Sequence, residues 1–188
     1  ANPAGLGEEP EPNTLTCPAC LGLPGAKPRV NEAVLWGALK AALALNCQVP
    51  GEMFFSRKTY FYPDMGKNFQ ITQYEVPLGE KGFLEVEGKR IRIRRVHIEE
   101  DPARLVHKGG MGGEVLADYN RSGTPLIEIV TEPDFSSPKE ARLYLQKLAL
   151  ILEYLGLYSP ESKAIIKSDA NISLQSGEQE GVRVEGKN

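Results

Sequence analysis

The stretch Arg90-Ile-Arg-Ile-Arg-Arg-Val-His-Ile-Glu-Glu-Asp101 alternates apolar and charged residues, which predicts a β-strand with one buried face. Its four apolar residues form two pairs of opposite parity, Ile91 with Ile93 and Val96 with Ile98. Both pairs can face the same core only if one extra residue enters the strand. We therefore expect a β-bulge near Arg94 or Arg95.

Shorter runs with the same period lie on both sides of this strand, at residues 83–86 and 126–130. Gly and Pro turns separate the runs, and the connections are too short for helical crossovers. This region is therefore expected to form a mostly antiparallel sheet. Two further strands are expected at 164–174 and 181–185.

Two helices are expected to pack on this sheet. Asn31 is an N-cap in front of the apolar stripe of residues 32–45. Ser137 and Glu140 form a capping box at the start of a second helix, and Gly156 provides its left-handed end. The fold class is therefore predicted as α+β, with a mostly antiparallel sheet and packed helices.

Composition and charge exclude several classes of protein. The chain has 188 residues, with 22 Lys and Arg against 25 Asp and Glu, so its formal charge is −3. General nucleic-acid binders are usually markedly basic, so any RNA contact must come from a local patch. Three cysteines are too few for a disulfide scaffold, and no apolar run is long enough to span a bilayer. We expect a cytoplasmic protein without a membrane segment.

The chain is expected to divide near residue 30. Residues 1–30 are rich in Pro and Gly, which predicts a loop region, and residues 31–188 are expected to form one domain. The first residue is not Met, and a strand-like alternation still runs through residues 182–188. We therefore expect a fragment of a longer protein, truncated at both ends.

Basic and aromatic residues gather in the turn-rich block 55–70. Its basic residues are Arg57, Lys58 and Lys67. On spacing alone, the simplest explanation is a surface loop with aromatic anchors and partly buried lysine stems. Guanidinium and ammonium groups of this kind are also suited to binding phosphate.

Three carboxylates follow one another at the end of the central strand: Glu99, Glu100 and Asp101. Such a cluster is suited to a hard cation such as magnesium. The competing explanation is a set of screened surface ion pairs with the preceding arginines.

Two more acidic residues interrupt strand-like segments. Glu128 lies within the apolar run 126–130, so its carboxylate must face water, pair, or bind a ligand. A solvent-facing position is the simplest of these. Asp169 shares one strand face with Asn171.

Cys17-Pro-Ala-Cys20 has the spacing of half a zinc site. Four ligands are required, and the other Cys and His residues of the chain are Cys47, His97 and His107. We therefore do not expect a closed zinc site from this chain alone, and residues upstream of Ala1 would be needed to complete one.

Taken together, these segments resemble the B subunit of the aspartyl/glutamyl-tRNA amidotransferases (GatB) over nearly the whole length of the chain. The matching motifs are Glu11-Pro-Asn-Thr14, Cys17-Pro-Ala-Cys-Leu-Gly-Leu-Pro-Gly25, Arg57-Lys-Thr-Tyr-Phe-Tyr-Pro-Asp64, Gln70-Ile-Thr-Gln-Tyr74, His97-Ile-Glu-Glu-Asp101, Asp118-Tyr-Asn-Arg-Ser-Gly-Thr-Pro-Leu-Ile-Glu-Ile-Val130, Asp169-Ala-Asn-Ile-Ser173 and Glu185-Gly-Lys-Asn188. The related archaeal subunit GatE shares several of them.

The resemblance implies that residues 31–188 form a cradle-shaped catalytic domain similar in fold to glutamine synthetase. It implies ATP-dependent phosphorylation of the side-chain carboxylate of Glu-tRNA(Gln) or Asp-tRNA(Asn), followed by amidation with ammonia. The ammonia reaches the site through a channel from a partner amidase subunit (GatA), and a small subunit (GatC) completes a heterotrimer. The implied cofactors are ATP and magnesium, with zinc as a further candidate.

The resemblance also suggests roles for individual residues. Those expected in catalysis are Glu99, Glu100, Glu128, Asp169 and Arg121. Those expected to contact ATP or to line the ammonia path are Arg57, Lys58 and Lys67. Within the first set, Glu99 and Glu100 are expected to bind magnesium or to position ATP. All four acids are expected to converge in one concavity together with Lys58 or Arg121.

The chain departs from the family pattern in several places. It lacks the family's Gly-Leu-Glu-x-His motif, whose Glu and His help to build the metal site, so we expect the isolated fragment to be inactive. The usual Asp-Ala-Gly-Lys is replaced by Asp101-Pro-Ala-Arg104. The competing class is a non-catalytic RNA-binding or assembly module. Convergent carboxylates argue against that class, because they would repel an RNA backbone.

Overall fold

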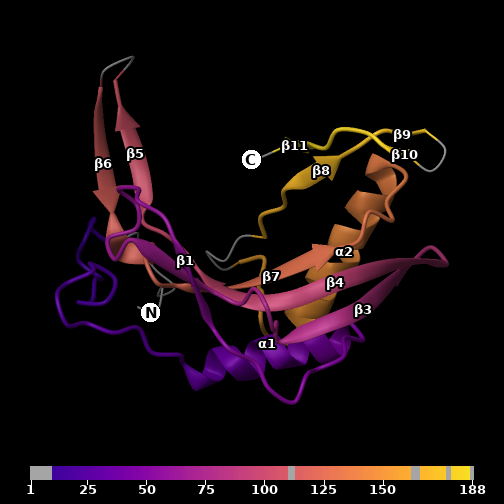
Figure 1. Cartoon of the computed structure of the whole chain (residues 1–188), viewed down its shortest axis with the longest axis horizontal. Helices are drawn as coiled ribbons and strands as arrows, with labels where there is room; N and C mark the ends of the chain where they lie inside the picture. The colour runs from indigo at the N-terminus through magenta and orange to yellow at the C-terminus, as the bar shows by residue number, and fades with distance from the viewer. Residues whose placement is uncertain (1–9, 110–112, 162–165, 177–178, 187–188) are drawn as a thin grey trace.

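A three-stranded antiparallel sheet forms the centre of the computed structural model, which describes residues 10–109, 113–161, 166–176 and 179–186 (Figure 1). In spatial order the strands are β3 (Gly79–Val86), β4 (Lys89–Glu100) and β7 (Pro125–Thr131). β4 is the middle strand and pairs on both sides. These strands coincide with the three alternating runs of the sequence, so the expected sheet is confirmed.

The pairing of β4 with β7 shifts between Ile93 and Arg95. Ile93 lies opposite Thr131 and Arg95 lies opposite Val130, so Arg94 is the extra residue of a bulge. The bulge returns both apolar pairs of β4 to one face, where all four side chains are buried: Ile91, Ile93, Val96 and Ile98. The bulge expected from the change of parity is confirmed.

Two helices pack against this apolar face. α1 (Glu32–Ala44) is capped by Asn31, and α2 (Pro138–Tyr154) is capped by Ser137. Gly156, with φ +69°, ends α2 as expected. The buried core joins both helices to the sheet through these side chains: Ala38, Ala42, Leu45, Tyr144 and Leu148 from the helical segments, with Leu84, Val86, Ile91, Ile93, Val96 and Ile98 from the strands.

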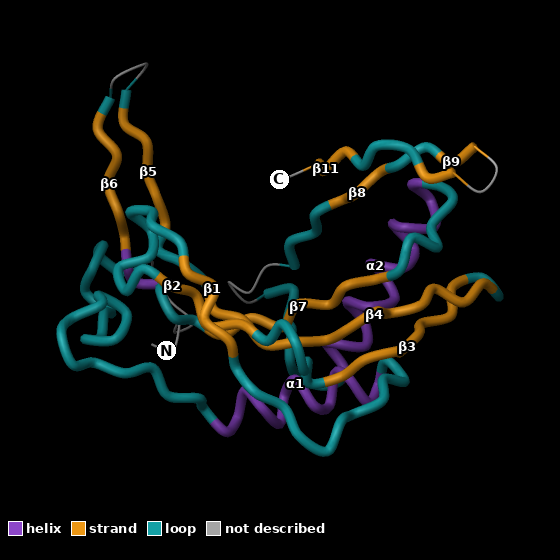
Figure 2. The backbone as a smooth tube through the Cα atoms, viewed as in Figure 1, coloured by secondary structure: helices purple, strands orange, loops and turns teal. Residues whose placement is uncertain are grey.

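Smaller two-stranded sheets extend from this body (Figure 2). β1 (Ser56–Thr59) pairs with β2 (Phe69–Thr72), and β2 in turn contacts β4. β5 (Arg104–Lys108) and β6 (Glu114–Asp118) form a hairpin that projects from the body in Figure 1. A short 3-10 helix, η1 (Tyr119–Arg121), follows β6 and leads into the loop before β7.

The C-terminal part forms two short antiparallel pairs. β8 (Ala170–Ile172) pairs with β11 (Val184–Gly186), and β9 (Gln175–Ser176) pairs with β10 (Gln179–Glu180). The strands expected at 164–174 and 181–185 are therefore observed in part, and residues 164–165 lie outside the described residues. In Figure 1 this unit and the β5–β6 hairpin rise from opposite ends of the central sheet.

The structure confirms an α+β fold with mainly antiparallel sheets and two helices. Residues 10–31 form turns and loops, and the proposed division of the chain near residue 30 stays a prediction. In the part of the chain that the structure describes, no helix has the length and apolar character needed to cross a membrane.

Candidate functional site

The acidic site, formed by His97, Glu99 and Glu128, lies where the end of β4 meets β7. His97 and Glu99 are two residues apart on β4, so they share one face of the sheet. Glu128 lies directly opposite His97 on β7. Nε2 of His97 is 3.2 Å from Oε1 of Glu99 and 3.3 Å from Oε2 of Glu128. The His97 side chain is 2% exposed and that of Glu128 is 48% exposed, so the acidic site opens to solvent beside Glu128.

Two side chains of β2 hold Glu99 in place. Thr72 Oγ1 donates to Oε1 of Glu99 at 2.7 Å, and Nε2 of Gln70 lies 3.5 Å from Oε2. Burial opposes ionisation of Glu99, but hydrogen bonds from His97 and Thr72, together with the imidazolium charge, lower its pKa to about 2. Glu99 is therefore ionised at neutral pH.

The charge of His97 is set by the same contacts. Burial alone would lower the pKa of His97, but the carboxylates of Glu128 and Glu99 outweigh burial and raise its pKa above the usual value. Its second ring nitrogen, Nδ1, is buried, and none of the described residues forms a hydrogen bond with it. The two carboxylates therefore favour the protonated form of the ring.

The acidic site has the donor atoms needed to bind a divalent cation. One ligand atom from each of its three residues lies within 4.8 Å of the others. Carboxylate oxygens are the ligands that magnesium prefers. A metal-bound imidazole usually donates its other N–H to a partner, and Nδ1 of His97 has none. Glu99 and Glu128 are therefore the groups that could hold a cation, and His97 is suited to orienting them.

Glu100 does not join the acidic site. Strand alternation turns its side chain to the opposite face of β4, where Oε1 lies 2.6 Å from Nζ of Lys67. The same oxygen accepts a hydrogen bond from the Ile71 amide at 2.7 Å. The two expected magnesium ligands are thus separated, because Glu99 faces the acidic site while Lys67 neutralises Glu100.

Arg57 and Lys58 lie on β1 and point to opposite faces. The guanidinium of Arg57 lies over the ring of Phe69, 4.7 Å from its centroid. Lys58 is exposed and pairs in register with Gln70. Because directly opposite residues share a face, Lys58 lies on the side of this small sheet that holds Glu99.

Arg121 pairs with a carboxylate that is not part of the acidic site, and Asp169 is exposed. The guanidinium of Arg121 donates to Oδ2 of Asp101 at 2.7 Å and is partly open to solvent. Asp169 is exposed, and among the described residues it is not part of the acidic site. Of the four acids expected to converge, two meet in the acidic site, one pairs with Lys67 and one is exposed.

Cys17 and Cys20 are free thiols whose Sγ atoms lie 2.6 Å apart. Burial raises the pKa of Cys17, but its hydrogen bonds with Cys20 outweigh burial and lower it. Burial and the neighbouring Cys17 raise the pKa of Cys20. Within the ranges that the structure describes, no third Cys, His, Asp or Glu joins them in a ligand group. The pair would supply two of the four ligands of a structural zinc ion.

Sequence reasoning did not assign His97, Gln70 or Thr72 to the site. A period-2 signal was present, since His97 precedes Glu99 by two residues and Gln70 precedes Thr72 by two. The contact between His97 and Glu128, however, depends on the register of β4 and β7. The contact between Thr72 and Glu99 depends on how β2 lies against β4. Neither arrangement follows from local pattern.

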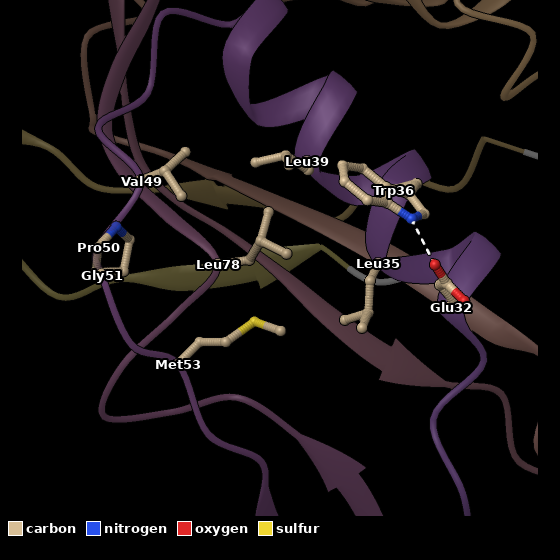
Figure 3. Close-up of a pocket in the computed structure, with 9 residues that line it drawn as sticks. All are labelled: Glu32, Leu35, Trp36, Leu39, Val49, Pro50, Gly51, Met53 and Leu78. Carbon is tan, nitrogen blue, oxygen red and sulfur yellow. Dashed lines mark hydrogen bonds between the residues drawn. The ribbon is translucent and has the colours of Figure 1, made fainter.

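A separate hollow of about 390 Å³ lies between α1 and the segment 49–53 (Figure 3). Its lining is mostly apolar and consists of Glu32, Leu35, Trp36, Leu39, Val49, Pro50, Gly51, Met53 and Leu78. Nε1 of Trp36 donates to Glu32 at 3.1 Å, as Figure 3 shows. This lining contains none of the residues expected in the site, and its chemistry does not suit a highly charged substrate.

The sequence matches a known protein family along almost its whole length. Residues 3–188 match the family described as the GatB/GatE catalytic domain. The chain belongs to this family. The match covers nearly all of the chain, and it includes every residue of the acidic site.

Several relatives resemble this GatB/GatE catalytic domain, and all are B subunits of the aspartyl/glutamyl-tRNA(Asn/Gln) amidotransferase. The relative from Methanospirillum hungatei is 55% identical over 184 residues, which is 95% of this chain and 38% of the relative. The relative from Saccharolobus solfataricus is 54% identical over 186 residues, 95% of this chain and 38% of the relative. That from Thermotoga petrophila is 49% identical over 197 residues, 99% of this chain and 40% of the relative. The chain thus spans about two fifths of these relatives' length.

Proposed function

We propose that this domain carries the ATP-dependent step of an aspartyl/glutamyl-tRNA amidotransferase. ATP phosphorylates the side-chain carboxylate of Glu-tRNA(Gln) or Asp-tRNA(Asn), and ammonia then displaces phosphate to form the amide. The net change converts carboxylate, ATP and ammonia into amide, ADP and phosphate. The observation that carries the proposal is the meeting of Glu99 and Glu128 in a chain whose residues 3–188 match a catalytic-domain family.

The chemistry explains why two carboxylates are needed. Phosphoryl transfer to a carboxylate brings several negative charges together. Glu99 and Glu128 would hold a divalent cation such as magnesium. When bound, the cation would neutralise negative charge on the phosphoryl group that is transferred. His97 would keep the two carboxylates at a fixed spacing, because its Nε2 contacts both of them. Thr72 would fix the rotamer of Glu99 in the same way.

We assign the remaining expected residues to binding and transport. Arg121 is proposed to orient phosphate or the acceptor carboxylate, since its side chain is 41% exposed beside Asp101. Arg57 and Lys58 are proposed to contact ATP from β1. The buried pair of Lys67 and Glu100 is proposed as a closed gate on the ammonia path. Asp169 is proposed as an acidic residue of the same reaction that acts from outside the acidic site, where it is exposed.

The activity is proposed for a complex. An amidase subunit (GatA) would release ammonia from glutamine, a small subunit (GatC) would complete the heterotrimer, and misacylated tRNA would supply the acceptor. Cys17 and Cys20 would belong to a zinc site that residues of the full-length subunit complete.

The test compares three variants of the full-length subunit in its complex: Glu99→Gln, Glu128→Gln and the control Glu132→Gln. Glu132 follows β7 closely but pairs with Arg94 outside the acidic site. Amide formation on both misacylated tRNAs is measured with and without ATP, and glutamine hydrolysis is measured in parallel. We expect the first two variants to lose about 100-fold or more in ATP-dependent amide formation while hydrolysis continues.

The control should retain amide formation at the wild-type level. Wild-type amide formation in both Glu99→Gln and Glu128→Gln would contradict the proposal and would favour a non-catalytic role for the domain in binding RNA.

A further inference from the structure

The bulge of β4 places two consecutive arginines on the face of the sheet that carries the acidic site. Ile93 and Val96 both point into the core, so the two residues between them, Arg94 and Arg95, both lie on the opposite face. In a regular strand only one of the two would do so. The bulge therefore adds one positive charge to this face.

The two arginines have different surroundings. Arg94 forms two hydrogen bonds with the carboxylate of Glu132, at 3.0 and 2.7 Å. Arg95 has no such partner: its Nε is buried without a hydrogen bond, and within the described residues no carboxylate pairs with its guanidinium. The Tyr74 ring lies 5.5 Å from the guanidinium carbon, a contact that leaves the N–H donors unused. A buried donor without a partner is rare in folded proteins.

Arg95 lies next to the acidic site. It precedes His97 by two residues on the same face, so the two Cα atoms are roughly 7 Å apart at the usual rise of a strand. In the neighbouring strand Val130 lies opposite Arg95, and Glu128 lies opposite His97. Arg95 therefore occupies the position next to His97 on this face of β4, and the neighbouring residue of β7 is apolar.

We infer that Arg95 binds the phosphoryl oxygens of the nucleoside triphosphate substrate. This inference rests on the proposed function. A guanidinium presents a planar set of donors that matches phosphate oxygens and stays charged at any physiological pH. A polyphosphate is long enough to contact both a cation at Glu99 and Glu128 and an arginine two residues along β4 from His97, whereas a single acceptor carboxylate is not.

The test uses the complete amidotransferase complex with Arg95→Ala, Arg95→Lys and the matched control Arg94→Ala. The KM for ATP, the KM for misacylated tRNA and kcat are measured for each, together with the midpoint of thermal unfolding. Amide formation by Arg95→Ala is also measured with added guanidinium ion, which can replace the missing group. If Arg95→Ala does not assemble, Arg95→Lys carries the test, since it keeps the charge and the aliphatic stem.

We expect Arg95→Ala to lose about 100-fold in kcat/KM for ATP, with the KM for tRNA unchanged and with partial recovery in guanidinium. Arg95→Lys should show a smaller loss of the same kind, and Arg94→Ala should behave as wild type. Wild-type kinetics for ATP in both Arg95 variants would overturn the inference, as would a rise in the KM for tRNA alone. Neither result would contradict the proposed function, provided that the wild-type complex forms amide with ATP. Absence of that wild-type activity would instead overturn the proposed function.

Discussion

Lys67 and Glu100 form a buried ion pair, with Nζ and Oε1 2.6 Å apart and side chains that are 8% and 11% exposed. The pair joins the loop before β2 to the last residue of β4. A buried pair of this kind contributes little when intact, because both charges have lost their water. Removal of one partner is costly, because the other charge stays buried without compensation.

We therefore predict that Lys67→Met lowers the free energy of unfolding of this domain by about 3 kcal/mol. Hydrogen exchange of the domain's amides in denaturant would measure the change. Lys81→Met is the control, because Lys81 pairs with Glu80 at the surface with 70% of its side chain exposed. The control should change stability by less than about 0.5 kcal/mol. Equal effects of the two substitutions would contradict a buried pair.

The same pair has a consequence for activity. We predict that Glu100→Gln abolishes ATP-dependent amide formation in the complete complex while glutamine hydrolysis remains measurable. The amide of Gln cannot neutralise the ammonium of Lys67, and the proposed gate would lose its charge balance. Unaltered amide formation by this variant would show that Glu100 is dispensable for the reaction.

A third prediction concerns alkaline pH. Cys47 is 7% exposed, and burial raises the pKa of its thiol from 9.0 to about 11. The unfolded chain therefore loses this proton at lower pH than the folded chain, so stability should fall as pH rises from about 9 to about 11. The difference of two pKa units corresponds to about 3 kcal/mol.

Cys47→Ala should lose less stability over this interval than the wild-type domain, as followed by denaturant unfolding at each pH. A decline of the same size in Cys47→Ala would mean that the Cys47 thiol does not contribute.

A fourth prediction concerns the contact between the end of α1 and β3. A Cβ atom at Gly82 would lie within 2.4 Å of Sγ of Cys47 and 2.6 Å of the carbonyl oxygen of Leu45. Gly82→Ala should therefore cost about 2 kcal/mol in the free energy of unfolding. Adding Cys47→Ala to Gly82→Ala should recover only part of the lost stability, because the clash with the Leu45 backbone remains. Gly51→Ala is the control, since a methyl group at Gly51 would have no atom within 4 Å. Equal stability of the Gly82 and Gly51 variants would contradict this packing.

Much of the fold could be predicted because its signals are local. The change of parity between Ile93 and Val96 requires a bulge wherever the strand is paired, and Asn31 and Ser137 cap the turns that follow them directly. The capping box was predicted only in part. The hydroxyl of Ser137 accepts from the amide of Glu140 as expected, but the carboxylate of Glu140 accepts from the amide of Ser136, one residue before the cap.

The site could be predicted only in part, because its contacts depend on how distant strands align. Glu99 and Glu100 are adjacent in sequence, yet alternation sends one to the acidic site and the other to Lys67. The sequence pattern names candidate acids, but it does not determine that β7 brings Glu128 opposite His97. Nor does it distinguish Arg95, whose guanidinium pairs with no carboxylate among the described residues, from its paired neighbour Arg94.

Glu99 and Glu128 are proposed to hold together the divalent cation of the ATP-dependent step. Mn²⁺, whose free form is counted by electron paramagnetic resonance, can be titrated into the complete complex in the presence of ATP. Glu99→Gln and Glu128→Gln should each weaken binding at this site by about 10-fold or more, while Glu132→Gln should leave it unchanged. Binding of Mn²⁺ with wild-type stoichiometry and affinity in both Glu99→Gln and Glu128→Gln would contradict the claim.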